Sequence, residues 1–306
     1  LIPGSGHLVH MPAHIYARVG RWHDAVIANQ RAIEADNNYL AACRPGPGVY
    51  PLGYVPHNHH FLWFAATMTG NRQIALAAAE STSERTSDPQ LMRMAGMEAM
   101  QNFAVTPLFA KVRFGQWQAI LQTPEPAADL PYMRAIWHYA QGTAAARQNR
   151  LDDAAKHLAA LRPLAADPVM ETMTMWDRYP LSHAAKIAER SLTAEVASAK
   201  GDHASAIAAL REAVTIEDRI PYDEPPGWHA PVRHSLGALL LAAKRPAEAE
   251  AVYREELLRN PGNGWSLHGL VQSLKAQGRT REATAVEQQR AQAWQHADVK
   301  LVASRF

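Results

Sequence analysis

Histidine residues gather near the start of the chain in two short clusters. The chain has 15 histidines, and the clusters have the sequences GHLVHMPAH, beginning at Gly6, and VPHNHHF, beginning at Val55. Imidazole nitrogens that converge from neighbouring elements can hold zinc, copper, iron or nickel. We therefore predict a transition-metal site. Its expected ligands are His10, His14, His57, His59 and His60.

The spacing within the clusters limits the chemistry that such a site could perform. A zinc protease of the HExxH type is excluded, because no glutamate stands between the histidines of the first cluster to act as general base. A catalytic metal site keeps an open position for water or substrate, so a metal-dependent hydrolase or oxidoreductase is one interpretation. Carboxylate partners are expected from loops much later in the chain, at Asp177, Asp223 or Glu224.

The two clusters occupy equivalent places in the sequence. His7 and His57 each stand thirteen residues before a glycine, Gly20 or Gly70, at which a helix is expected to end. If the clusters begin the first helices of neighbouring repeats, they lie side by side along one wall of the molecule. This equivalence is the reason for assigning both clusters to one site.

Proline and asparagine indicate where these helices begin. Pro12 suits a first helical turn, which predicts a helix from about Met11 with His7 and His10 on the loop that enters it. Asn58 is a good N-cap residue and predicts a second helix start at that position.

A simpler interpretation of the histidines remains open. His234 and His268 stand ten residues before later helix breaks, as His10 and His60 do before theirs. This position could therefore be a packing position that accepts imidazole. The metal interpretation depends on the density of the two clusters.

The elements that carry these residues follow a short pattern that occurs seven times. A small or polar residue is followed five positions later by alanine, or by Ile120 in one copy. The first residue lets the chain leave one helix and start the next, and the alanine lets the two helices approach closely. The break positions are Gly20, Gly70, Gly115, Asn149, Gly201, Lys244 and Gly278.

The pattern resembles the tetratricopeptide repeat (TPR). Lys244 and Gly278 are separated by the 34 residues typical of that family, and Pro261 closes a repeat where the family usually has proline. The resemblance implies an all-α fold, a right-handed superhelical α-solenoid of about seven TPR-like helix-turn-helix pairs with inserted Pro/Gly-rich loops. It is strongest over residues 13–48, 194–222 and 231–290.

The motifs HMPxHI and PHNxHF are also similar to those of a group of bacterial TPR proteins. Members of that group are generally longer, with a further histidine-containing helical region ahead of the equivalent of Leu1. We therefore expect the chain to be a processed or truncated piece of a longer protein. For function, the resemblance implies a concave groove and nothing more specific.

Proline-rich segments divide the array and should shape the rim of its groove. We predict histidine-rich repeats over residues 1–126 and further repeats over 127–306, in one continuous solenoid whose last helix is a polar cap. The loop at 220–229 should control access to the groove. Residues expected at the groove or its rim are His7, Trp63, Tyr222, Asp223, Glu224, Trp228 and His229.

Composition excludes several other classes of protein. A formal net charge of +2 gives no electrostatic case for nucleic acid. The longest apolar run, Leu236 to Ala243, is too short for a membrane span. Neither a phosphate-binding loop nor a dinucleotide fingerprint is present, so no nucleotide cofactor is expected. The single cysteine, Cys43, fits a reducing compartment, and we expect a cytoplasmic protein.

A non-enzymatic scaffold is the alternative function. Its groove would bind a peptide, a partner protein or a small molecule, with Trp63, Arg113 and Trp228 as contacts. A scaffold spreads its groove-facing polar residues along the superhelix, whereas a site concentrates them. The histidines are concentrated, which favours a site.

Overall fold

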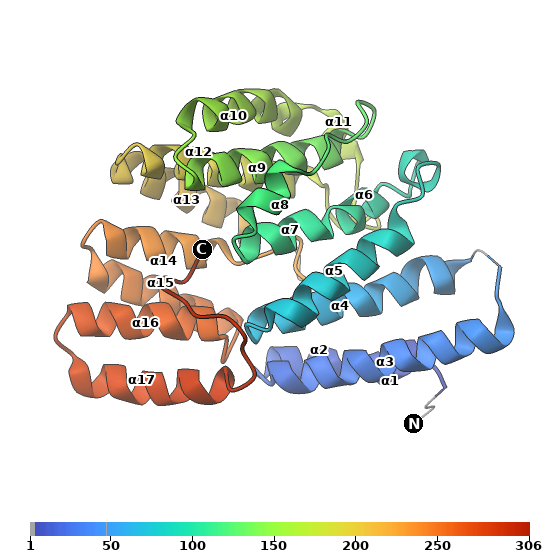
Figure 1. The fold of residues 1–306 in the computed structure, drawn as a ribbon, viewed down its shortest axis with the longest axis horizontal. Helices are drawn as coiled ribbons and strands as arrows, with labels where there is room; N and C mark the ends of the chain where they lie inside the picture. Colours follow the sequence, from blue (N-terminus) through green and yellow to red (C-terminus); the bar gives the residue numbers. More distant parts are fainter. Residues whose placement is uncertain (1–3, 47) are drawn as a thin grey trace.

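The structure is a computed structural model that describes residues 4–46 and 48–306. The described residues form helices joined by turns and loops, with an isolated bridge between Thr174 and Pro180 and no β-sheet (Figure 1). None of the helices in this part of the chain combines the length and apolar character needed to cross a membrane.

The first half of the chain contains the elements that surround the histidine clusters. The first cluster lies in two short helices, and the second lies in one longer helix. The elements are α1 (Gly6–His10), α2 (Pro12–Arg18), α3 (Trp22–Cys43), the π-helix η1 (Tyr50–Tyr54), α4 (Val55–Met68), α5 (Arg72–Thr86), the 3-10 helix η2 (Leu91–Arg93), α6 (Ala99–Ala104), α7 (Thr106–Arg113) and α8 (Trp117–Leu121).

The second half continues the array with longer helices. Its elements are α9 (Pro131–Arg147), α10 (Leu151–Ala166), α11 (Val169–Thr172), α12 (Ser182–Ala199), α13 (His203–Glu217), α14 (Val232–Ala242), α15 (Pro246–Arg259), α16 (Gly264–Ala276) and α17 (Thr280–Ala293).

Each of the seven break positions lies between two consecutive helices and has a positive φ, between 58° and 80°. Five of them are glycines, which adopt this left-handed conformation without a steric penalty, whereas Asn149 and Lys244 adopt it as ordinary residues. The residue five positions later is fully buried in every copy, from Ala25 to Ala283. The small side chains at these positions therefore allow close packing of the paired helices.

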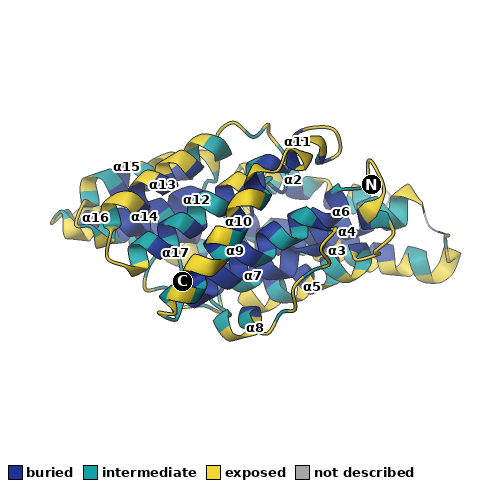
Figure 2. Cartoon of the chain, turned by 90° about the horizontal axis from the view of Figure 1, so that it is seen from above, coloured by how far each residue is buried: buried dark blue, intermediate teal, exposed yellow. Residues whose placement is uncertain are grey.

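Adjacent helices pack closely in pairs, among them α4 with α5, α9 with α10, α12 with α13, α14 with α15, and α16 with α17. This arrangement is consistent with an α-solenoid. The right-handed superhelix, the number of repeats and the division after residue 126 stay predictions. Nearly all residues of α4 are buried, so this helix lies inside the molecule (Figure 2).

The last helices lie against the first ones, so the array curls back on itself (Figure 1). Trp22 Nε1, at the start of α3, donates a hydrogen bond of 2.7 Å to the carbonyl of Pro261. Trp294 Nε1, directly after α17, donates one of 3.0 Å to the carbonyl of Met68 at the end of α4. These contacts bring the C-terminal half to the histidine-containing helices.

The segment after α17 runs back across the array. The carboxylate of Asp298 accepts hydrogen bonds from the backbone N–H groups of Arg72 and Gln73, the first two residues of α5. Further on, the Ser304 hydroxyl lies 2.6 Å from the Tyr253 hydroxyl of α15. This segment therefore fills space between repeats instead of extending into solvent.

Candidate metal centre

The first cluster is more helical than its sequence predicted. His7 and His10 lie within α1, because Pro12 begins α2 directly after a short first helix instead of following a loop. The prediction that Asn58 caps a helix is also wrong. The π-helix η1 runs straight into α4, Pro56 occupies the first turn, and Asn58 is an internal, buried residue.

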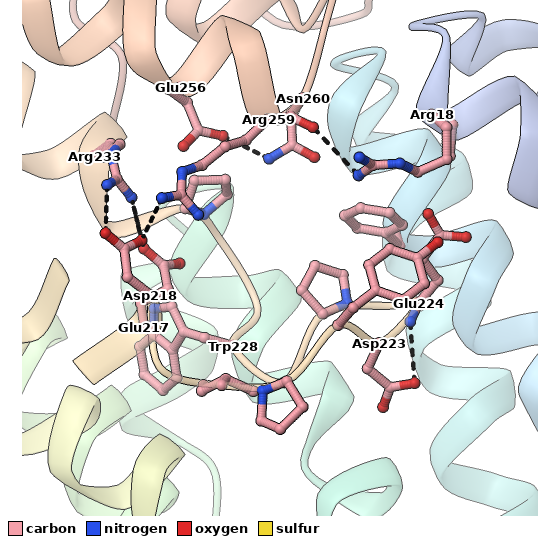
Figure 3. Close-up of a pocket in the computed structure, with 18 of the residues that line it drawn as sticks. Arg18, Glu217, Asp218, Asp223, Glu224, Trp228, Arg233, Glu256, Arg259 and Asn260 are labelled. Carbon is pink, nitrogen blue, oxygen red and sulfur yellow. Dashed lines mark hydrogen bonds and ion pairs between the residues drawn. The ribbon is translucent and has the colours of Figure 1, made fainter. Parts of the chain in front are cut away.

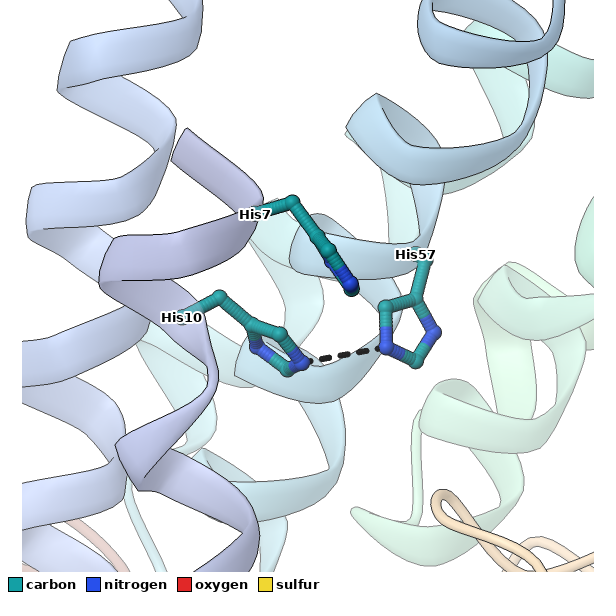
Figure 4. Close-up of side chains that lie close together, drawn as sticks. All are labelled: His7, His10 and His57. Carbon is teal, nitrogen blue, oxygen red and sulfur yellow. Dashed lines mark hydrogen bonds between the residues drawn. The ribbon is translucent and has the colours of Figure 1, made fainter. Parts of the chain in front are cut away.

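Three imidazoles converge where α1 and α2 meet α4. His10 Nε2 lies 2.9 Å from His14 Nε2 and 3.1 Å from His57 Nε2. His7, expected at the groove rim, joins them: one ring nitrogen each of His7, His10 and His57 lies within 4.8 Å of the other two (Figure 4). The structure thus gathers His7, His10, His14 and His57 into one cluster, which we call the imidazole cluster.

Asn29 of α3 fixes the tautomer of His10. The Nδ2 of Asn29 donates to the carbonyl of Ala25 at 2.7 Å, which turns its Oδ1 toward His10 Nδ1 at 2.8 Å. Since an amide oxygen only accepts, Nδ1 of His10 carries the proton. The Nε2 of His10 therefore points a lone pair at the two neighbouring imidazoles.

Glu224 orients the ring of His14 in a similar way. Its carboxylate oxygen Oε2 lies 2.6 Å from His14 Nδ1, so Nδ1 donates and Nε2 is turned toward His10. The Nε2 atoms of His10 and His14 then face each other across 2.9 Å, a distance at which a proton on one ring or a bound cation lies between them. Burial lowers the pKa of His10 to about 3, so His10 is neutral near pH 7 and its Nε2 keeps a lone pair.

His7 is held by a chain of hydrogen bonds that starts at a buried carboxylate. Tyr50 of η1 donates to Asp36 Oδ1 at 2.7 Å and accepts from the backbone N–H of His7 at 3.2 Å. The ring of His7 packs at 4.3 Å from that of Tyr54. Its buried Nδ1 has no hydrogen-bond partner among the described residues, so it is free to act as a ligand.

The other two predicted ligands, His59 and His60, lie outside the group of converging ring nitrogens. His60 is buried, with its ring stacked 5.0 Å from that of Trp63 and edge-to-face with that of Phe103 at 4.8 Å. His59 is also buried, and the nearby Arg85 adds to the effect of burial in lowering its pKa to about 4. On a helix, His59 lies on a different face from His57, which explains why neighbours in the sequence separate in space.

A pocket of about 270 Å³ opens beside the imidazole cluster. His14, His57 and His60 line one part of it, and Trp176 and Glu224 line another. Ligands could therefore reach the cluster from solvent.

The loop predicted to control access lies partly at this pocket. Tyr222 is exposed, and Asp223 pairs with Arg178 at 2.6 Å. Two other residues expected at the rim, Trp228 and His229, are buried and contact α7 through Phe109. Aromatic packing thus draws this end of the loop into the core.

Trp63 is likewise buried, inside α4, instead of lining an open groove. Of the three acidic residues expected near the site, Glu224 reaches the imidazole cluster. Asp223 lies in the pocket wall, while Asp177 bonds to Thr174 of its own turn.

Asn29 and Asp36 were not predicted from the sequence, although a signal existed. They share one face of α3 with Ala25 and Ala32, at helical spacing. All four residues are buried. A polar residue on the apolar face of a helix needs a hydrogen-bond partner, and here those partners belong to the site.

A second cavity, of about 150 Å³, is also lined by Glu224 (Figure 3). Arg233 holds Asp218 there with two hydrogen bonds of 2.8 and 2.7 Å. Burial raises the pKa of Glu217 to about 8 and that of Glu256 to about 7. The cavity thus contains two carboxyl groups whose pKa values lie near neutral pH.

Comparison with known proteins gives limited information. No protein-family model matches the chain. The cellulose synthase operon protein C of Xanthomonas axonopodis pv. citri (strain 306) is 42% identical over 93 residues, which is 30% of this chain. The chain spans only 6% of that relative's length. The similarity and the all-helical architecture together fit a TPR-like family of helical-repeat proteins.

Proposed function

We propose that this chain is a helical-repeat protein that binds a divalent transition metal, zinc in the first place, in the imidazole cluster. His7, His10 and His57, whose ring nitrogens lie within 4.8 Å of one another, would supply three ligands, with His14 as a fourth. The observation that carries the proposal is the convergence of ring nitrogens on His10 Nε2, with the Nδ1 atoms of His10 and His14 held by Asn29 and Glu224.

The spacing of the nitrogens is close to what such an ion requires. Tetrahedral zinc with ligands at about 2.0–2.1 Å places their nitrogens roughly 3.3 Å apart. The two separations from His10 Nε2, 2.9 Å to His14 and 3.1 Å to His57, would have to widen by a few tenths of an ångström. The nitrogens of His7, His10 and His57, which lie within 4.8 Å of one another, would have to close around the ion. Asn29 and Glu224 supply the outer hydrogen bonds that orient metal-bound histidines. Copper, iron and nickel accept the same donor set.

The pocket beside the cluster extends the proposal toward catalysis. An ion bound there by three imidazoles would keep a position open to the pocket, where it could activate water or polarise a substrate. A metal-dependent hydrolase or oxidoreductase is therefore the class of enzyme that this arrangement supports. We further propose that the chain belongs to the bacterial TPR group with HMPxHI and PHNxHF motifs.

A scaffold that binds a peptide, partner protein or small molecule is the second candidate. The paired helices and the similarity to cellulose synthase operon protein C favour it. Cys43 is exposed and unpaired, which supports a cytoplasmic location for either function.

Elemental analysis of the untagged protein tests the proposal. We expect close to one transition-metal ion per chain, lost in His10→Ala and in His57→Ala but kept in the control His203→Ala, whose histidine begins α13 far from the cluster. Circular dichroism must show that the variants are folded. If the wild type takes up no metal even after reconstitution, the metal site is refuted and the scaffold becomes the better account.

A further inference from the structure

A small cavity of about 50 Å³, distinct from the imidazole cluster, lies between α7, α9, α12 and the C-terminal segment. Three arginines line it: Arg113 ends α7, Arg147 ends α9, and Arg305 belongs to the C-terminal segment. Glu195 of α12 is the carboxylate in its wall, and it pairs with both Arg147 and Arg305. Glu195 therefore pairs with two of the three guanidinium groups, and that of Arg113 has no carboxylate partner in the cavity wall.

That third group, Arg113, is buried without a carboxylate hydrogen bond. Its Nη2 lies 2.9 Å from His234 Nδ1, and its guanidinium packs 3.5 Å from the ring of Trp265. Glu256 lies close enough to stabilise the charge on Arg113, but burial raises the pKa of Glu256 itself to about 7. Burial lowers the pKa of Arg113 to about 9, as expected for a poorly compensated charge.

Three hydrogen-bonding atoms of the residues lining this cavity are also unused. Arg113 Nε, Thr143 Oγ1 and His229 Nδ1 are buried and have no partner in the described chain. His229 Nε2 lies 3.2 Å from the Tyr139 hydroxyl. When Nε2 accepts a hydrogen bond from that hydroxyl, the proton of the neutral ring is on Nδ1, which can then donate to a ligand. Buried donors without partners are rare in folded proteins, and several in one place indicate a missing acceptor.

The size of the cavity limits what that acceptor can be. About 10–15 Å³ of such space holds one water-sized group, so the cavity holds a molecule of four or five heavy atoms. We propose that it binds a tetrahedral oxyanion such as phosphate or sulfate. Arg113, Thr143 and His229 would donate to it, and its charge would balance the surplus guanidinium.

Calorimetric titration of the full chain with inorganic phosphate, at constant ionic strength set by chloride, tests this site. We expect one phosphate per chain, with sulfate competing for the same site. Arg113→Met should weaken binding at least 10-fold, because it removes a charge-assisted donor. Arg150→Met, which removes an exposed arginine that pairs with Asp153, should change nothing.

A second variant guards against the loss of folding. Thr143→Val keeps the shape of the side chain and removes only the hydroxyl, so it should fold and bind phosphate several-fold more weakly. The proposal is overturned if the wild type binds neither anion at millimolar concentration. It is equally overturned if folded Thr143→Val and Arg113→Met bind phosphate as tightly as the wild type.

Discussion

The Nδ1 atom of His14 lies 2.6 Å from the Oε2 atom of Glu224, although 210 residues separate them in the sequence. The contact exists because the array curls back and lays the loop before α14 against α2. A hydrogen bond from a histidine to a carboxylate makes the opposite ring nitrogen a better metal ligand. The C-terminal half of the chain thus completes a site whose imidazoles all come from the N-terminal half.

Substitution Glu224→Gln is predicted to weaken metal binding about 10- to 100-fold, the usual effect of losing an outer-shell partner. The glutamine keeps the volume of the side chain but loses the charge that stabilises the metal-bound imidazole. Competition with a chromophoric chelator measures the affinity. The matched control is Glu34→Gln on the exposed face of α3, and equal affinities in the two variants would show that Glu224 has no role at the metal.

Substitution Gly6→Ala is predicted to disturb the imidazole cluster through the backbone. A Cβ atom at Gly6 would lie 2.0 Å from Asp36 Oδ1 and 2.6 Å from the carbonyl oxygen of Ala32, so α1 would have to move away from α3. We expect a loss of stability of about 1–3 kcal/mol and a lower metal content, because His7 and His10 move with α1.

Chemical denaturation and elemental analysis measure the two effects of Gly6→Ala. Gly4→Ala is the control, because nothing lies within 4 Å of a Cβ atom at that position. If Gly6→Ala keeps both its stability and its metal, the tight contact between α1 and α3 does not position the cluster.

The local features of the fold could be predicted from the sequence because neighbouring residues determine them. All seven break positions separate consecutive helices, as their small or polar residues predicted, and the residue five positions later is buried each time. The closure of the array was not predicted. It depends on contacts such as that of Trp22 with the Pro261 carbonyl, 239 residues away, which no local pattern reveals.

The candidate site shows the same division between local and distant information. His10, His14 and His57 could be named from the density of histidines. His59 and His60 could not be separated from them until the actual start of α4 gave the direction of each side chain. Trp228 and His229 were placed at the rim because their loop is rich in proline, but packing on Phe109 buries them.

The break at Lys244 offers a test of how the paired helices are joined. Its φ of 58° is unfavourable for a side chain with a Cβ atom, and the residue is exposed. Lys244→Gly should therefore raise the free energy of unfolding by about 0.5–1 kcal/mol. Lys200→Gly, at an ordinary backbone conformation directly before Gly201, should lower it. Urea denaturation compares the two, and a loss of stability in Lys244→Gly would contradict the left-handed turn.

Glu256 should make the protein less stable as the pH rises. Burial raises its pKa to about 7 in the folded state, above the 4.5 of an ordinary glutamate in the unfolded chain, so the folded protein holds its proton to higher pH. The resulting stability is fully present below pH 4.5 and is lost as the pH rises through 7, by about 2 kcal/mol between pH 5.5 and 8. Glutamine is neutral at every pH. The free energy of unfolding of Glu256→Gln, measured by urea denaturation, should therefore rise relative to that of the wild type by about 2 kcal/mol between pH 5.5 and 8. Glu34→Gln should gain nothing, and a pH-independent difference for Glu256→Gln would mean that Glu256 is ionised throughout.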